Sequence, residues 1–266
     1  MREKPSAAGK TFLIIVFSIL YAPIFYLIFY SFNSGGTMSG FEGFTLDWYR
    51  ELLGDTRLLI IVLNTLVIAL LSALIATIIG TFGAIGIHSL KKNKGSILGL
   101  NNVLIVSPDV IIGASFLILF TIAGMRLGFY SVLLSHIAFS IPIVVLLVLP
   151  KLAEMNPSLI DAARDLGASS WDVFTKVIFP YITPGIFAGF FMALTYSLDD
   201  FAVTFFVTGN GFSTLSVEIY SMARQGISLN INALSTILFL FTILLVGIYY
   251  MLTQRSGLRI GGSFRR

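Results

Sequence analysis

The chain has 266 residues, of which 56% are hydrophobic and only 11% carry a charged side chain. Soluble domains carry about 25% charged residues, so this composition predicts a protein whose main solvent is the lipid bilayer. The sequence has no cysteine and two distant histidines, which excludes disulfides and thiolate catalysis and argues against a metal site. The net charge of +4 does not indicate nucleic acid, because the basic residues gather at the ends of apolar segments.

Six apolar segments are long enough to cross a bilayer, since about 20 helical residues span its hydrocarbon core. A helix also satisfies its own backbone hydrogen bonds, which lipid requires. The sequence therefore predicts an all-α, polytopic membrane protein with six transmembrane helices, built as a single domain over residues 1–266. The predicted helices cover residues 11–32, 58–87, 100–123, 129–150, 181–207 and 231–253.

Lysine and arginine residues predict how these helices are oriented. Most of the 17 basic residues lie in four regions, namely the two ends of the chain and the loops at 88–99 and 151–180. Loops that stay in the cytoplasm carry an excess of such residues. We therefore expect both termini and the 151–180 loop to be cytoplasmic.

The first outer loop, residues 33–57, is net acidic and carries Trp48 and Tyr49. Aromatic residues are enriched where a membrane meets water, so one interpretation is an interfacial helix with an aromatic anchor. The other interpretation is a lip that meets a partner or a cationic solute outside. The pattern leaves both open.

The third predicted helix carries an acid, Asp109, near the middle of the bilayer. A carboxylate at that depth is costly and marks a functional site by default. The alternative is that Ser107 and Pro108 break the helix and Asp109 caps its restart. In the fourth predicted helix, His136 is interpreted as a hydrogen-bonded structural residue rather than a proton relay.

The loop between the fourth and fifth predicted helices is polar but patterned. Asn156 and Pro157 are typical of a helix start, and Gly167 is typical of a helix end. Ser169 and Asp172 then have the spacing of a capping box. The loop is predicted to be a helix, a glycine turn and a second helix, whose apolar stripes either pack on the chain's own bundle or dock a partner. The first stripe is Leu159, Ala162, Ala163 and Leu166, and the second is Trp171, Phe174 and Ile178.

The fifth predicted helix carries two adjacent acids, Asp199 and Asp200. Tyr196 and Ser197 precede Asp200 by four and three residues, so each can share a helix face with it. No lysine or arginine lies inside these helices. The charge must therefore be neutralised by a proton, a partner chain or a cationic substrate, unless the acids act as helix caps.

The polar loop resembles the EAA motif of the permeases of ATP-binding-cassette (ABC) importers. The match consists of Asp161-Ala-Ala, then Gly167 after three residues, then Val177-Ile-Phe-Pro180 after nine more. Aspartate replaces glutamate at the first position, and Val177 and Phe179 replace isoleucine and leucine, which keeps charge sign and apolar character. In that family the loop seats in a groove of a separate ATP-binding subunit. The resemblance implies that six residues make this contact: Asp161, Ala162, Ala163, Asp165, Gly167 and Ala168.

Further motifs along nearly the whole chain are similar to the PotC-type permeases of spermidine/putrescine importers. They are Ser31-Phe-Asn-Ser34, Phe44-x-x-x-Trp48-Tyr49, Ser107-Pro-Asp-Val110, Ala162-Ala-Arg-Asp-Leu-Gly-Ala-Ser169, Ser197-x-Asp199-Asp200 and Phe206-Val-Thr-Gly209. The resemblance implies a multi-pass subunit of the bacterial cytoplasmic membrane that imports polyamines and is not itself an enzyme. Its implied partners are a PotB-type second permease, a homodimer of a PotA-type ATPase and a PotD-type extracytoplasmic binding protein. ATP and magnesium would be held by the ATPase, so no cofactor is expected in this chain.

Polyamines are flexible polycations, so carboxylates and aromatic faces suit them. We therefore hypothesise that the buried acids and their neighbours line the translocation path, with Trp48 near its outer mouth. The other members of this predicted path are Asp109, Tyr196, Ser197, Asp199 and Asp200.

Three other functions are weighed against this one. An ABC permease for thiamine, iron or phosphonate would share the loop motif. A secondary transporter would be expected to show an inverted internal repeat, which is not apparent. A membrane enzyme would need a nucleophile–base pair or a metal cluster, and neither is evident.

Overall fold

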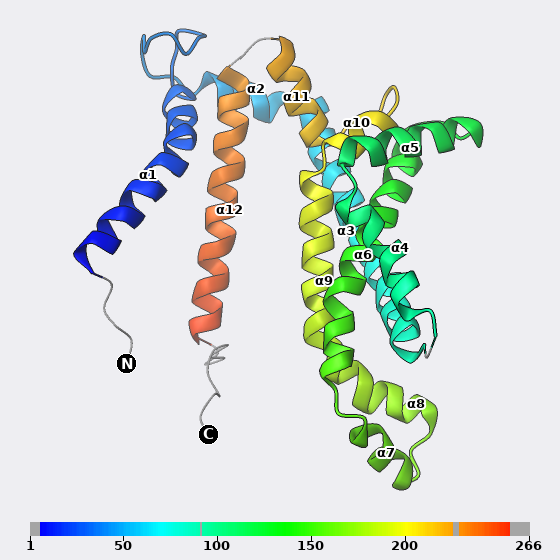
Figure 1. The fold of residues 1–266 in the computed structure, drawn as a ribbon. Coiled ribbons are helices and arrows are strands. Elements are labelled where there is room, and N and C mark those ends of the chain that lie inside the picture. Colours follow the sequence, from blue (N-terminus) through cyan, green and yellow to red (C-terminus); the bar gives the residue numbers. More distant parts are fainter. Residues whose placement is uncertain (1–5, 91, 226–228, 256–266) are drawn as a thin grey trace. The chain divides into compact units, whose positions relative to one another are not determined.

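The computed structural model describes residues 6–90, 92–225 and 229–255 (Figure 1). Within these residues the regular structure is helical, with one isolated β-bridge between Asn33 and Phe44, which confirms the predicted all-α class. The chain divides into two compact units. The first unit comprises residues up to Leu58 and from Ile219 onwards, and the second comprises Leu59–Glu218.

The first unit contains α1, α2 and α12, and α12 packs against both of the others. Most α1 side chains are exposed, as expected of a helix that faces lipid or another chain. The bounds of these helices are α1 (Ala7–Tyr30), α2 (Asp47–Gly54) and α12 (Leu229–Arg255), and α11 (Leu215–Gln225) contributes its second half.

The second unit is built around α6 and α9, which lie side by side, with α5 and α10 near one end and α7 and α8 near the other (Figure 1). Its helices are α3 (Thr56–Ser89), which begins in the first unit, α4 (Lys94–Val106), α5 (Asp109–Ile122), α6 (Phe129–Glu154), α7 (Ser158–Asp165), α8 (Ser170–Val173), the π-helical turn η1 (Phe174–Ile178), α9 (Phe179–Asp199) and α10 (Ala202–Val207).

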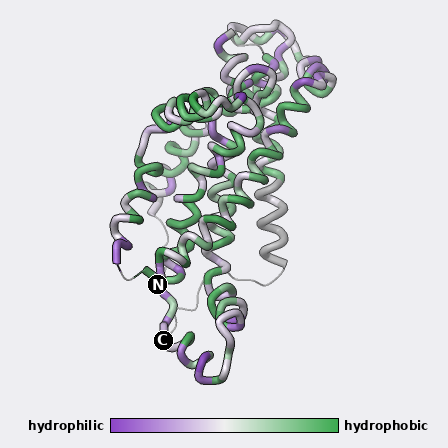
Figure 2. Tube along the Cα trace, turned by 90° about the vertical axis from the view of Figure 1, so that its right-hand side faces the viewer, coloured by the Kyte–Doolittle hydropathy of each residue, from purple (hydrophilic) through white to green (hydrophobic). Residues whose placement is uncertain are grey.

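Among the residues that the structure describes, four continuous helical segments are long and apolar enough to cross a membrane, or five if the bent pair α4–α5 counts as one span. Figure 2 shows hydrophobic residues along the long helices and hydrophilic ones mainly near their ends. Within α12, the segment Leu229–Leu244 is a shorter apolar helix. The chain is thus a multi-pass membrane protein, and the count of six spans stays a prediction.

Two of the predicted helices are not continuous. The prediction for 100–123 is wrong in this respect, because the chain bends by 102° between Val106 and Asp109. The prediction for 181–207 is wrong as well, since α9 ends at Asp199 and α10 is a separate short helix. In both places the break lies beside an acidic residue, so the polar groups that the sequence placed inside helices lie at helix ends.

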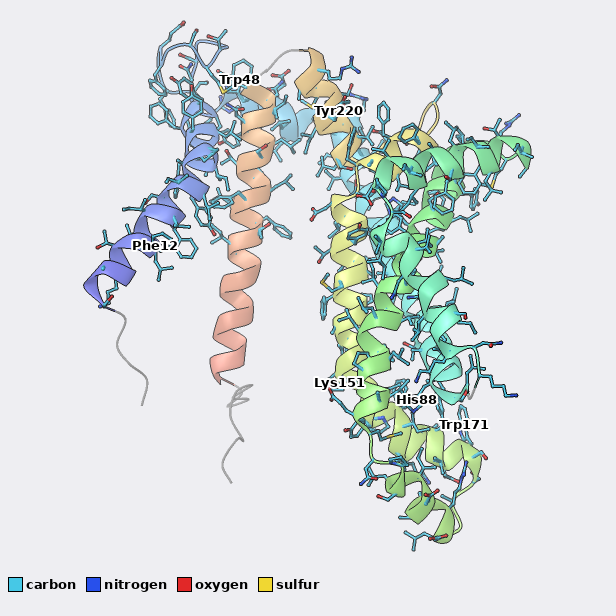
Figure 3. All side chains as sticks on the ribbon, in the orientation of Figure 1. Phe12, Trp48, His88, Lys151, Trp171 and Tyr220 are labelled. Atoms are coloured by element: carbon cyan, nitrogen blue, oxygen red, sulfur yellow. The ribbon has the colours of Figure 1, made fainter. Side chains whose placement is uncertain are left out.

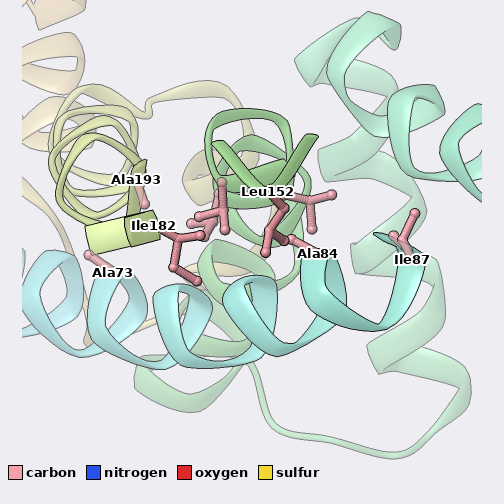
Figure 4. Close-up of a cluster of buried hydrophobic side chains, with 9 residues drawn as sticks. Ala73, Ala84, Ile87, Leu152, Ile182 and Ala193 are labelled. Carbon is pink, nitrogen blue, oxygen red and sulfur yellow. The ribbon is translucent and has the colours of Figure 1, made fainter. Parts of the chain in front are cut away.

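A hydrophobic cluster between α3, α6 and α9 forms the main core of the second unit (Figure 4). Lipid is as apolar as these side chains, so membrane helices associate mainly through close van der Waals packing at small residues. At Gly185 an added Cβ would lie 2.9 Å from the Leu147 carbonyl oxygen, and at Gly189 it would lie 3.2 Å from Val144. The Gly185–Gly189 pattern therefore packs α9 on α6 of the same chain. The cluster contains Ala73, Ala84, Ile87, Val144, Val145, Val148, Leu152, Ile182 and Ala193.

Candidate functional site

The break between α4 and α5 determines where Asp109 lies. A residue before proline is forced out of the helical region, and Ser107 accordingly has φ −69° and ψ 140°. The next helix, α5, then begins at Asp109, where a negative charge is favoured by the helix dipole. The predicted break and restart of the helix are therefore confirmed, but the capping role is not, because Asp109 is the first residue of α5 and Pro108 occupies the N-cap position. The Asp109 side chain is exposed, and the hydroxyl of Tyr196 donates to its Oδ1 at 3.3 Å.

At the end of α9 the two adjacent acids separate. Asp199 is the last helical residue and is exposed. Asp200 is extended, with ψ 119°, and its side chain is only 5% exposed. Its Oδ1 accepts from the backbone N–H of Val203 at 3.3 Å, and its Oδ2 accepts from that of Thr204 at 2.8 Å. Asp200 thus caps the N-terminus of α10, whereas Asp199 leaves its carboxylate free to meet another molecule.

His136 on α6 connects the ends of α9 and α10. Its Nδ1 lies 2.6 Å from Ser197 Oγ, and its Nε2 lies 2.8 Å from Thr204 Oγ1 and 3.5 Å from Asp200 Oδ2. Ser72 on α3 donates to Ser197 Oγ at 3.0 Å. The His136 side chain is 1% exposed, which confirms that it is hydrogen-bonded within the protein, while its role stays a prediction. These five residues, Ser72, His136, Ser197, Asp200 and Thr204, are called the His136 network below.

The predicted path residues of α9 therefore fall into two groups. The prediction that Asp200 shares a helical face with Tyr196 and Ser197 is wrong, because the helix ends before Asp200. The structure brings Ser197 and Asp200 together through His136, and it brings Tyr196 to Asp109 instead. One group is buried and the other is exposed, and the path-lining role of all of them stays a prediction.

Trp48 lies in the first unit, on α2. Its indole Nε1 donates to the carbonyl oxygen of Asn33 at 2.8 Å. The Asn33 side chain is buried and binds backbone groups of the 33–44 loop, donating to Thr37 and Gly40 and accepting from Glu42. Trp48 thus helps to hold a compact loop, and both the anchor and the lip interpretations remain compatible with its half-buried ring.

The loop between α6 and α9 has the predicted helix–glycine–helix form. The Asn156 side chain accepts the N–H of Ser158 at 3.1 Å at the start of α7. Gly167 has φ +81°, and its N–H and that of Ala168 bond back to the carbonyls of Arg164 and Ala163. These two bonds form a Schellman motif, which favours glycine at the left-handed position.

The second helix of the loop begins with the predicted capping box. Ser169 Oγ accepts the N–H of Asp172 at 3.2 Å, and the Asp172 carboxylate accepts the N–H of Ser169 at 3.3 Å. Asp172 also pairs with Lys176 at 2.6 Å. Residues 156–178 are called the two-helix loop below.

The predicted apolar stripe of α7 is not covered by the chain. Leu166 is 89% exposed and Leu159 is 45% exposed. Trp171 on α8 is 71% exposed and lies at the same end of the second unit as Lys151 and His88 (Figure 3). The remaining predicted coupling residues lie on this loop too: Asp161, Ala162 and Asp165 are exposed, and Ala163 and Ala168 are partly exposed.

Sequence reasoning missed Ser72 and Thr204 as parts of the site. Hydroxyl residues are common in membrane helices and commonly bond to the carbonyl four residues back, so neither stands out. Recognising them required the end of α9 at Asp199, which the sequence did not indicate.

Comparisons with known proteins agree with this architecture. The family described as "Binding-protein-dependent transport system inner membrane component" matches residues 5–257. The chain is 38% identical over 236 residues to the spermidine/putrescine transport system permease protein PotC of Escherichia coli strain K12, which covers 88% of this chain and 89% of that protein. It is 35% identical over 234 residues to the putrescine transport system permease protein PotI of the same strain, with 85% and 83% covered.

The fold is also found in a solved structure. A chain of the bacterial alginate ABC transporter, crystallised in complex with an alginate pentasaccharide-bound periplasmic protein, matches with a TM-score of 0.71 at 17% identity, and 96% of each chain is covered. At that identity the likeness concerns the fold alone. The family match and the two permease relatives go further, and the chain therefore belongs to the family of binding-protein-dependent transport system inner membrane components and is a homologue of the PotC and PotI permeases.

Proposed function

We propose that this chain is a permease subunit of an ATP-driven importer that moves polyamines inward across the bacterial cytoplasmic membrane. The similarity to permeases named for spermidine and putrescine carries this proposal. The geometry supports it, because Asp109 and Asp199 expose carboxylates and Tyr196 adds an aromatic ring beside Asp109. Carboxylates and aromatic faces are suited to a flexible polycation.

A separate ATPase is the proposed source of energy. The two-helix loop leaves Leu159, Leu166 and Trp171 exposed, and an apolar surface rimmed by polar groups is typical of a protein interface. We propose that a homodimer of a PotA-type ATPase binds this surface of the loop. The ATPase would hold ATP and magnesium. A PotB-type second permease and a PotD-type binding protein complete the proposed importer.

The orientation of the chain follows from its charges. Lys92, Lys94, Lys151 and Lys176 belong to the 88–99 and 151–180 regions, and the labelled residues His88, Lys151 and Trp171 lie at one end of the second unit (Figure 3). Positive charge near the ends of membrane helices favours the cytoplasmic side. We infer that this end, with the two-helix loop, faces the cytoplasm and that Asp199 lies nearer the opposite side.

The proposal is tested with the complete importer in liposomes. The chain is reconstituted with its second permease and ATPase, and the binding protein is supplied with radiolabelled spermidine or putrescine. We expect ATP-dependent uptake of polyamine and co-purification of the ATPase with the permease. Uptake of thiamine, iron or phosphonate in place of polyamine would contradict the proposed substrate, and transport without an ATPase would contradict the proposed class.

The substrate path is tested in the same liposomes. Hydrogen bonds to charged groups are worth enough that neutralising Asp109 or Asp199 to asparagine is expected to raise the KM for polyamine about tenfold. Asp47→Asn is the matched control, because Asp47 is an exposed acid of α2 whose side chain contacts Thr45 and Arg50 of the same segment. An unchanged KM in both Asp109→Asn and Asp199→Asn would remove these two residues from the path.

A further inference from the structure

The Asp200 carboxylate is fully engaged inside the protein. Oδ2 accepts two hydrogen bonds, from the N–H of Thr204 at 2.8 Å and from the Thr204 hydroxyl at 2.7 Å. It also lies 3.5 Å from His136 Nε2. Oδ1 accepts the N–H of Val203 at 3.3 Å. With the side chain 5% exposed, both oxygens serve the protein rather than a passing solute.

Each hydroxyl of the His136 network can donate only one proton, and this limit indicates which groups donate and which accept. The Thr204 hydroxyl donates its single proton to the ionised Asp200, so it accepts from His136 Nε2, which must carry a hydrogen. With the hydrogen of a neutral ring on Nε2, His136 Nδ1 is an acceptor, so Ser197 donates to it. Ser72 has both Ser197 Oγ, at 3.0 Å, and the Ala69 carbonyl oxygen, at 3.2 Å, as acceptors. The result is one directed chain from α3 through α9 and α6 to α10, in which each donor meets an acceptor.

This chain of bonds has consequences for Asp109, because α10 packs closely on α5. At Gly113 of α5 an added Cβ would lie 3.0 Å from the Val203 Cα and 3.2 Å from the Ala202 carbonyl oxygen. Contact this close makes α5 follow any shift of α10. Four residues before Gly113, α5 begins at Asp109, whose carboxylate receives the Tyr196 hydroxyl.

We propose that His136 and Asp200 are positioning residues: together they hold α10 against α6 and α9, and α10 holds Asp109 of α5 beside Tyr196. The proposal rests on the proposed function, and it assigns the substrate contact to the exposed Asp109 and Asp199 while Asp200 acts through them. Two acids that are adjacent in the sequence, Asp199 and Asp200, thus have different roles.

The first test measures the KM for polyamine in the reconstituted importer, normalised to folded complex. His136→Leu removes both ring contacts, so Asp109 loses its position and the KM is expected to rise several-fold, toward that of Asp109→Asn. In the double variant His136→Leu/Asp109→Asn we expect a KM within about twofold of Asp109→Asn alone, because residues that act through one another are not additive. His136→Gln, which keeps a donor for Thr204, is expected to restore part of the loss.

Matched controls and contrary outcomes make this test decisive. His88→Leu changes the other histidine, which is exposed, and should leave the KM unchanged. If His136→Leu lowers stability but leaves the KM of the folded complex unchanged, His136 is merely structural and the proposal fails. If the effects of His136→Leu and Asp109→Asn multiply, His136 does not act through Asp109 and the proposal also fails.

The second test needs no substrate and therefore separates this proposal from the proposed function. The thermal unfolding midpoint of the purified complex is measured for His136→Leu, Asp200→Asn and their double variant. We expect both single variants to lower the midpoint and the double to be no lower than the worse single, whereas additive losses would show that the two residues are not joined. Wild-type liposomes that import no polyamine would overturn the proposed function and leave this result standing.

A milder substitution covers the case in which His136→Leu does not fold. Thr204→Val removes the hydroxyl between His136 and Asp200 and keeps the backbone N–H that Asp200 caps. It is expected to raise the KM as His136→Leu does. Thr195→Val is its control, because the Thr195 hydroxyl donates to the Phe191 carbonyl oxygen within the same helix. Equal KM values for the two variants would overturn the proposal.

Discussion

The His136 network and the two-helix loop lie toward opposite ends of α9 and treat polar and apolar groups in opposite ways. In the network, buried side chains from α3, α6, α9 and α10 form hydrogen bonds to one another. In the two-helix loop the backbone caps itself, but Leu166 and Trp171 remain 89% and 71% exposed. The network satisfies its polar groups within the chain. The loop packs Val173, Phe174 and Ile178 on the chain but leaves Leu166 and Trp171 exposed.

The difference reflects the two solvents of a membrane protein. Hydrocarbon offers no hydrogen bonds, so a polar group at that depth needs a partner from the protein itself. Water offers hydrogen bonds freely but disfavours large apolar surface, so an exposed apolar stripe on a capped helix indicates a missing partner. Contacts within the chain therefore explain the network, whereas the exposed apolar residues of the loop are consistent with the proposed contact with an ATPase.

The largest expected effect comes from disrupting the packing of α9 on α6, because α9 connects the two-helix loop to the His136 network. Gly185→Ala places a Cβ 2.9 Å from the Leu147 carbonyl oxygen and 3.3 Å from the Val148 Cα. Such overpacking costs about 1–3 kcal/mol, so we expect a lower unfolding midpoint and less folded permease. Gly86→Ala on α3, where nothing lies within 4 Å, should be neutral or stabilising. Equal midpoints for the two variants would refute the close α6–α9 contact.

The next effect concerns the uncovered stripe. Leu166→Asp places a charge at the C-cap of α7, on the most exposed apolar side chain of the two-helix loop. Loss of a central contact of an interface commonly weakens binding tenfold or more, about 2 kcal/mol. We expect the purified permease to fold normally and to lose the ATPase on co-purification. Ser170→Asp, an added charge in the first turn of α8 where the helix dipole tolerates it, is the control. An ATPase that stays bound to Leu166→Asp would place the interface elsewhere.

A smaller effect is expected at the glycine turn between the two loop helices. Gly167→Ala forces a side chain into φ +81°, which costs about 1–2 kcal/mol for a residue other than glycine. The Schellman motif should loosen, which would be measured as faster amide hydrogen exchange in residues 163–169 and weaker stimulation of the ATPase. Gly124→Ala carries a similar strain at φ +65° outside the loop. If both variants impair the ATPase equally, backbone strain alone explains the loss.

The smallest effect is expected at the capping box. Asp172→Asn keeps the hydrogen bonds to Ser169 but removes the charge that pairs with Lys176. Exposed ion pairs contribute little, so ATPase affinity should change by less than about twofold, and raised ionic strength should abolish the difference by screening. A large loss that persists at high salt would mean that Asp172 contacts the ATPase directly.

Much of this architecture was predictable from local sequence. Capping depends on residues within one turn of each other. The sequence therefore correctly predicted the helix start at Asn156, the glycine turn at Gly167 and the capping box of Ser169 and Asp172. The break at Ser107–Pro108 was one of two interpretations that the sequence left open. The break after Asp199 was not predicted, since the segment 181–207 is apolar enough to have the composition of a continuous span despite its two acids. The His136 network could not be predicted either, because its members are far apart in the chain: Ser72 and Ser197, for example, are separated by 125 residues.

The sequence by itself determined that the chain is an all-helical membrane protein with a capped polar loop, because hydropathy, charge placement and capping are local properties. Only the tertiary structure decided which of the acids is free. Asp199 and Asp200 are neighbours with the same chemistry, and the end of α9 exposes the first and turns the second toward His136. Which of the two acids is exposed depends on how α6 packs beside α10, and such packing cannot be derived from any local sequence pattern.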